Sequence, residues 1–161
     1  MAELFSVTGT AKEEKYRSLV VAIGALMQGE PDIIANMANV TATIKEVFGF
    51  LWVGFYRVVG DELVLGPFQG LVACNRIKKG RGVCGVSWEK AESVIVPDVN
   101  RFAGHIACSS KSKSEIVVPV FSNNEIIGVL DIDSEYLNTF DKTDEKYLSQ
   151  IVKLLPLPDA L

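Results

Sequence analysis

The chain has 161 residues, of which 48% are hydrophobic and 22% charged, and its formal net charge is −4. This size and composition suit one globular domain and exclude a disordered chain, and the acidic balance gives no general attraction for nucleic acid or anionic lipid. No apolar run approaches the roughly 20 residues that cross a membrane, and residues 2–15 lack the apolar core of a signal peptide. We therefore expect a cytoplasmic protein whose thiols stay reduced.

Two segments with helical periodicity come first. Apolar side chains recur at three- and four-residue spacing from about residue 11 to 28, and Gly29 and Pro31 separate this segment from a second one that ends near Phe48. We interpret both apolar stripes as core packing rather than as ligand-binding surfaces.

The next segment, residues 51–59, predicts a central strand because aromatic and β-branched side chains fill both of its faces. The turn Gly60-Asp61 then predicts an antiparallel partner over residues 62–65. Trp52 and Tyr56 share one face of the first strand, where they either wall a pocket or fill the core.

The middle of the chain is less regular. Short strands are predicted near residues 71–77 and over 93–96, and between them a glycine-rich turn precedes a short helix over 83–91. Amide groups at the start of this helix could bind a carboxylate, whereas the glycine spacing matches neither a Walker loop nor a dinucleotide fingerprint. Residues 98–114 predict a functional loop or lid.

The clearest hairpin joins residues 115–121 to 125–133, and a C-terminal helix after Asp141 is ended by Pro156 and Pro158.

The register of this hairpin decides which carboxylates meet. Asp131 and Asp133 share a face because side chains alternate along a strand. A two-residue turn, Asn123-Asn124, would put Glu115 on the opposite face, whereas a three-residue turn over 122–124 would set it opposite Asp131. We expect the three-residue turn, or a bulge with the same effect.

Three cysteines, Cys74, Cys84 and Cys108, bracket a stretch rich in glycine and basic residues. They are either small buried apolar residues or a reactive set. A structural disulfide framework is disfavoured by the odd number, and zinc by the absence of a Cys-x-x-Cys motif. His105 is the single histidine, and we expect it to be exposed and without a role.

Two helices, an antiparallel sheet and a closing helix make a three-layer α+β domain. The order of these elements, with Val118-Pro119-Val120 followed by residues 127–131, resembles GAF domains. This resemblance covers nearly the whole chain and implies a single GAF-like domain over residues 1–161, an antiparallel β-sheet flanked by helices.

Four short motifs narrow the resemblance: GRGVCG at 80–85, HIAC at 105–108, SEI at 114–116 and DID at 131–133. Together they resemble the free methionine-(R)-sulfoxide reductases, in which the GAF pocket is an active site for the free amino acid. The resemblance implies that this domain is catalytic and reduces free methionine-(R)-sulfoxide to methionine.

The same resemblance implies roles for individual side chains. Cys108 corresponds to the nucleophile, Cys74 to the main resolving cysteine, and Cys84 to a second resolving thiol or a pocket residue. The carboxylates surround the substrate and two aromatic rings lie near its methyl group, namely Glu115, Asp131, Asp133, Trp52 and Tyr56.

These residue types suit the reaction. A thiolate that attacks sulfur needs a lowered pKa, and Cys108 lies among polar residues close to Lys111. The departing sulfoxide oxygen needs a proton, for which Glu115 is the nearest acid in sequence. The resulting sulfenic acid condenses with a second thiol to a disulfide that an external dithiol such as thioredoxin reduces, so no metal or organic cofactor is required.

Two other functions fit the sequence. A GAF-type sensor would bind a small ligand without turnover, and a thiol redox switch would form the disulfide with peroxide. The sequence leaves open which of Cys74 and Cys84 resolves and whether the chain forms a homodimer.

Overall fold

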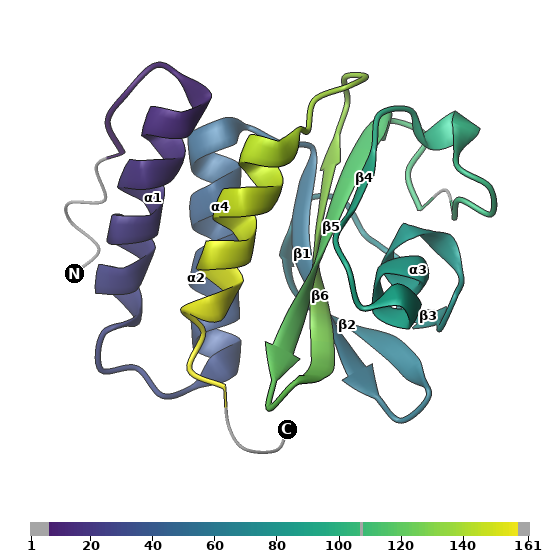
Figure 1. The fold of residues 1–161 in the computed structure, drawn as a ribbon, viewed down its shortest axis with the longest axis horizontal. Coiled ribbons are helices and arrows are strands. Elements are labelled where there is room, and N and C mark those ends of the chain that lie inside the picture. The colour runs from purple at the N-terminus through teal and green to yellow at the C-terminus, as the bar shows by residue number, and fades with distance from the viewer. Residues whose placement is uncertain (1–6, 107, 158–161) are drawn as a thin grey trace.

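The computed structural model describes residues 7–106 and 108–157 and places helices on both sides of a sheet (Figure 1). The helices of this part of the chain are α1 (Lys12–Met27), α2 (Ile33–Phe48), α3 (Gly82–Lys90) and α4 (Lys142–Lys153). The strands are β1 (Trp52–Val59), β2 (Glu62–Gln69), β3 (Arg76–Lys78), β4 (Val94–Val96), β5 (Ser114–Ser122) and β6 (Glu125–Ser134), and a 3-10 turn, η1 (Val99–Arg101), follows β4.

All neighbouring strands of the sheet are antiparallel, and their order is β3-β2-β1-β6-β5-β4. The strand β1 lies inside the sheet between β2 and β6 and is buried over its first five residues. The predictions of a central strand at 51–59 and of an α+β fold with an antiparallel sheet flanked by helices are both confirmed.

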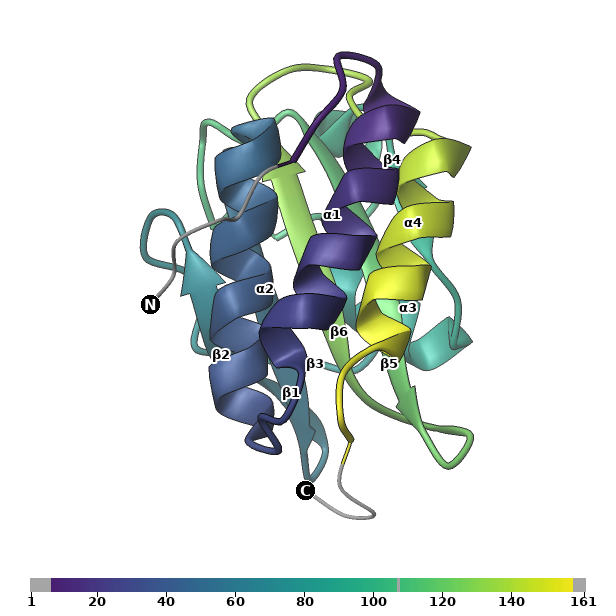
Figure 2. The ribbon, with the colours of Figure 1, turned by 90° about the vertical axis from the view of Figure 1, so that its left-hand side faces the viewer.

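Three helices cover one face of the sheet. The helix α2 packs on β1 and β2, α4 packs on β5, and α1 lies outside both helices (Figure 2). Local chemistry fixes where two of them begin, because the side chain of Asp32 accepts a hydrogen bond from the amide of Ala35 at α2 and that of Asp141 accepts one from the amide of Thr143 at α4.

The hydrophobic interior has two parts, one on each side of the sheet. The larger part lies between the sheet and α1, α2 and α4, and it includes the side chains predicted to form the two N-terminal stripes, such as Leu19, Ile23 and Ile44. The smaller part lies between the sheet and α3 and includes Trp52, Tyr56 and Cys84. The second part is interrupted by polar groups, which form the site described below.

The expected three-residue turn in the β5–β6 hairpin is wrong. The turn is Asn123-Asn124, both residues have positive φ of 50° and 63°, and Ser122 pairs with Glu125, as in a two-residue hairpin of the primed type. A register shift beyond Phe121 leaves Ile127 as an extra residue on β6. This bulge returns the three carboxylates to one face, as predicted, but it sets Glu115 opposite Asp133 and not opposite the predicted Asp131.

Several boundaries differ from the sequence prediction. The strand β2 continues to Gln69 instead of ending at 65, and the strand expected near 71–77 is confined to Arg76–Lys78. Pro158, predicted to end the last helix, and residues 2–6 of the N-terminal segment lie outside the described residues. Among the described helices, none is long and apolar enough to cross a membrane.

Candidate active site

A pocket opens on the side of the sheet that carries α3. Its walls come from β1, from the loop after β2, from the start of α3, from the loop before β5, and from β5 and β6. Seven of the eight predicted site residues line it, namely Trp52, Tyr56, Cys84, Cys108, Glu115, Asp131 and Asp133. The eighth, Cys74, is covalently linked to Cys108.

The disulfide between Cys74 and Cys108 joins the loop after β2 to the loop before β5, and the two Cα atoms are 6.0 Å apart. Cys108 is exposed and Cys74 is half-buried. The backbone carbonyl of Cys74 accepts a hydrogen bond of 2.9 Å from the Tyr56 hydroxyl, which anchors this end of the bridge to β1. The bridge lies between two irregular segments instead of holding elements of the core together.

Cys84 is the free cysteine of the described chain and is buried in the first turn of α3. The helix begins at Gly82, one residue before the predicted start, with a φ of 61° that favours glycine. Burial raises the pKa of the Cys84 thiol, and the nearby Asp131 and Glu115 raise it further. At neutral pH this cysteine is therefore a neutral thiol.

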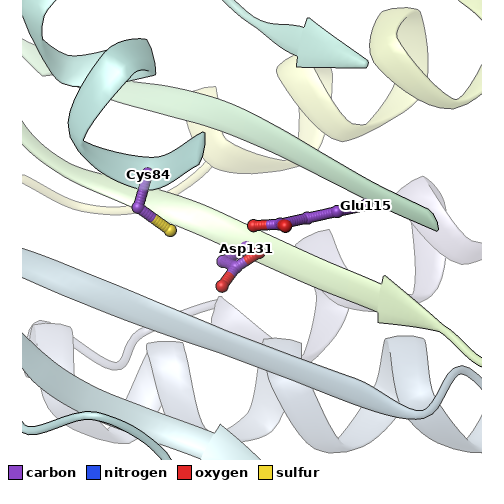
Figure 3. A group of neighbouring side chains, drawn as sticks. All are labelled: Cys84, Glu115 and Asp131. Carbon is purple, nitrogen blue, oxygen red and sulfur yellow. The ribbon is translucent and has the colours of Figure 1, made fainter. Parts of the chain in front are cut away.

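Cys84 faces two carboxyl groups from adjacent strands. Figure 3 shows its sulfur directed toward Glu115 on β5 and Asp131 on β6. One ligand atom from each of the three residues lies within 4.8 Å of the others, a spacing that could also hold a metal ion. The Oδ1 atom of Asp131 is buried and has no hydrogen-bond partner among the described residues.

The register explains why the carboxylates converge. Glu115 is paired with Asp133 across β5 and β6, and Asp133 is paired with Trp52 across β6 and β1. Asp131 lies two residues from Asp133 on the same face, beside Gly54 of β1. A single row of the sheet therefore contains an aromatic ring and two carboxyl groups.

Burial makes these carboxyls hold protons. Desolvation and the neighbouring Asp133 raise the pKa of Glu115 to about 8, although a hydrogen bond with Asp131 acts in the opposite direction. Desolvation and Asp131 raise the pKa of Asp133 to about 8, opposed by a hydrogen bond from Ser112 and by His105. The pKa of Asp131 is raised by burial and by Glu115. At neutral pH the cluster therefore retains protons that exposed carboxylates would lose.

The expectation for His105 is wrong. Its side chain is only 14% exposed, and its Nε2 atom lies 3.5 Å from Oε2 of Glu115. Its sequence context indicated no role, because a lone histidine in a polar loop belongs to no periodic pattern. The HIAC motif contained the signal, since it places this histidine three residues before Cys108.

Aromatic rings from β1 line the pocket beside the carboxyl groups. The indole of Trp52 stacks on Phe68 with centroids 5.3 Å apart and lies 6.0 Å from the ring of Tyr56. The indole N–H donates a 2.9 Å hydrogen bond to the carbonyl of Leu71. Burial and the nearby Asp131 raise the pKa of Tyr56, so this hydroxyl stays neutral and donates to Cys74. Both rings therefore line the pocket, and both also pack in the smaller part of the hydrophobic interior, so each of the two alternatives holds in part.

The GAF domain family model matches residues 32–155 of the chain. GAF domain-containing protein A of Dictyostelium discoideum is 59% identical over 96% of this chain and 99% of its own length. The free methionine-R-sulfoxide reductase of Escherichia coli (strain K12) is 47% identical over 89% of this chain and 88% of its own length. The X-ray structure of the free methionine-R-sulfoxide reductase of Neisseria meningitidis in complex with its substrate shares 50% identity and a TM-score of 0.93, over 95% of this chain and 93% of that one. The chain therefore belongs to the GAF domain family and, within it, to the free methionine-R-sulfoxide reductases.

Proposed function

We propose that this chain reduces free L-methionine-(R)-sulfoxide to L-methionine by thiol chemistry, and that residues 1–161 act as one catalytic domain. The observation that carries the proposal is the joining of two features in one pocket: a proton-holding carboxyl cluster and an exposed cysteine that can form a disulfide. Relatives and a substrate-bound structure that carry this activity in their names support the choice of substrate.

In the first step the Cys108 thiolate attacks the sulfoxide sulfur. Glu115 supplies a proton to the sulfoxide oxygen, because its raised pKa keeps it protonated at neutral pH. The S–O bond of the substrate breaks and the oxygen passes to Cys108. Thiolate, sulfoxide and proton thus give a sulfenic acid and methionine, and the two electrons come from the cysteine sulfur.

In the second step Cys74 resolves the intermediate. Its thiol attacks the sulfenic sulfur of Cys108, water leaves, and the disulfide forms. The pairing of these two residues in the structure supports Cys74 as the resolving thiol. The raised pKa of Cys84 makes it a poor nucleophile and favours its role as a pocket residue. A cytoplasmic dithiol protein such as thioredoxin then restores both thiols.

The remaining groups bind the free amino acid. The unpartnered Oδ1 of Asp131 and the carboxyl of Asp133 can receive the α-ammonium group, whose charge relieves the repulsion among the carboxylates. Trp52 and Tyr56 form the apolar wall against which the methyl group packs. His105 holds the Glu115 carboxyl in place.

The direct test measures methionine released from methionine-(R)-sulfoxide with dithiothreitol as reductant. We expect wild-type turnover and no turnover by Cys108→Ser, because no other exposed thiol lies in the pocket. Cys74→Ser should still release about one methionine per chain in a single turnover, since sulfenic acid formation does not require it.

Full activity of Cys108→Ser would refute the assigned nucleophile. Ligand binding without release of methionine would favour a sensor, and disulfide formation with peroxide but without sulfoxide turnover would favour a redox switch.

A further inference from the structure

The two loops joined by the disulfide expose apolar side chains beside Cys108. Val72 is 88% exposed, Leu71 is 51% exposed and Ile106 is 37% exposed, and all three lie at the mouth of the pocket that Cys108 lines. The exposure of Val72 means that this side chain contributes almost nothing to the core. Clustered aliphatic side chains in contact with water are a feature of interaction surfaces.

We propose that Leu71, Val72 and Ile106 form a docking surface, here called the reductant face, for an acidic dithiol protein of the thioredoxin class. This inference rests on the proposed function, because it assumes that the Cys74–Cys108 bridge must be reduced in every cycle.

Access identifies the sulfur that the partner attacks. Cys108 is exposed, whereas Cys74 is half-buried and its backbone is bonded to Tyr56. A thiolate of the partner therefore attacks Cys108, the S–S bond breaks, and Cys74 leaves as a thiolate that takes up a proton. The second thiol of the partner then attacks the mixed disulfide, so the partner is oxidised by two electrons and both cysteines of this chain are reduced.

The reductant face is held in position by pocket residues. The carbonyl of Leu71 accepts the hydrogen bond from the indole of Trp52. A Cβ atom added at Gly82 would lie 3.1 Å from the side chain of Ile106, so this isoleucine rests against the start of α3. Because both loops are braced, the apolar side chains present a formed surface, which lowers the ordering cost of association.

Charge around the disulfide favours an acidic partner. Residues 63–88 and 99–114 carry seven lysines and arginines and no aspartate or glutamate, although the whole chain has a net charge of −4. Arg76 and Arg101 are paired with Glu62 and Asp98. Arg81 precedes the Gly82 that contacts Ile106, and Lys111 follows Cys108 by three residues. Both are exposed and have no ion-pair partner in the described part of the chain, so both can offer positive charge to an acidic partner.

The test compares two electron donors for the same reaction, thioredoxin and dithiothreitol. Val72→Glu should raise the KM for thioredoxin at least about fivefold, a typical cost at the centre of an interface. Its dithiothreitol-driven rate should stay within about twofold of wild type, because a small dithiol needs no docking surface. The matched control is Val21→Glu on α1, where the valine is 73% exposed on the helical side of the sheet, and it should change neither rate.

A second readout needs no sulfoxide. A thioredoxin variant whose second cysteine is serine should form a trapped mixed disulfide with the oxidised chain, and peptide mapping should place it on Cys108. Val72→Glu should slow this trapping, and added salt should slow it for the wild type.

If Val72→Glu lowered the rate of methionine release equally with thioredoxin and with dithiothreitol, the surface would be assigned to substrate binding and the proposal would be overturned. Unchanged kinetics with thioredoxin, or trapping on Cys74, would also overturn it. Failure of the proposed function gives a different result, which is no methionine from the wild type with either donor while the mixed disulfide still forms.

Discussion

Glu115 and Asp133 have the properties that the chemistry requires. Each is surrounded by protein, each neighbours another carboxyl, and each has a pKa raised to about 8. An exposed glutamate ionises near 4.5 and an exposed aspartate near 3.8, so both groups hold protons over a range in which exposed carboxyls are charged. A protonated carboxyl next to a thiol site can act as the acid for a leaving sulfoxide oxygen.

The pH profile of turnover tests this assignment. Because the acid must be protonated, kcat should fall as the pH rises past about 8. Glu115→Gln cannot donate a proton and should lower kcat by about 10²–10⁴-fold and flatten this descending limb. Glu125→Gln, an exposed glutamate in the same hairpin, is the matched control and should behave as wild type. A wild-type profile for Glu115→Gln would remove the acid role.

Individual site residues could be predicted to different degrees. The cysteines and carboxylates could be singled out because their motifs are contiguous in sequence, and the structure brings them together at one pocket. The position of His105 next to Glu115 could not be derived, since it depends on how the loop before β5 folds over the sheet. The sequence also left open which cysteine lies beside Cys108, and the structure bonds Cys74 to it.

At the scale of elements, the β5–β6 hairpin shows what periodicity can establish. Alternation places Asp131 and Asp133 on one face, but the face of Glu115 depends on turn length and bulges together. The sequence Asn123-Asn124 favours a two-residue turn on local chemistry alone. The bulge at Ile127 then shifts the register by one residue and returns Glu115 to the face of Asp131 and Asp133. The local sequence gives no strong signal for this bulge, because it depends on how β6 pairs with β5. Helix and strand positions were otherwise predicted well, with errors concentrated in residues 66–78.

The strand β1 offers an element-scale prediction. A Cβ atom added at Gly54 would overlap the Trp52 ring and approach Cβ of Phe68 to 2.6 Å. Gly54→Ala should therefore displace the aromatic wall and raise the KM for methionine sulfoxide several-fold, with a smaller effect on the single-turnover chemistry of Cys108. Gly24→Ala on α1 is the control, because nothing lies within 4 Å of its added Cβ. It should leave the KM unchanged and stabilise the helix by about 0.5–1 kcal/mol. An unchanged KM for methionine sulfoxide in Gly54→Ala would show that the position of the Trp52 ring does not affect substrate binding.

In the molecule as a whole, one face of the sheet holds most of the hydrophobic core and the other face holds the pocket. The side that carries α1, α2 and α4 holds most of the apolar core, and the buried Asp144 ties α1 to α4 through hydrogen bonds from Tyr16 at 2.7 Å and Lys12 at 2.6 Å. The side that carries α3 has a smaller apolar core, because three carboxyls and a thiol line the pocket there. Burying those groups is unfavourable for stability, and the rigid opposite face keeps the strands in register.

We expect this buried acidic pocket to select the free amino acid over a sulfoxide that lacks the ammonium group. The most direct test compares kcat/KM for free L-methionine-(R)-sulfoxide with that for the N-acetylated compound, which lacks the ammonium group but keeps the sulfoxide. Loss of a buried charge interaction costs several kcal/mol, so the free compound should be preferred by at least about a hundredfold. Equal values of kcat/KM for the two compounds would contradict the account.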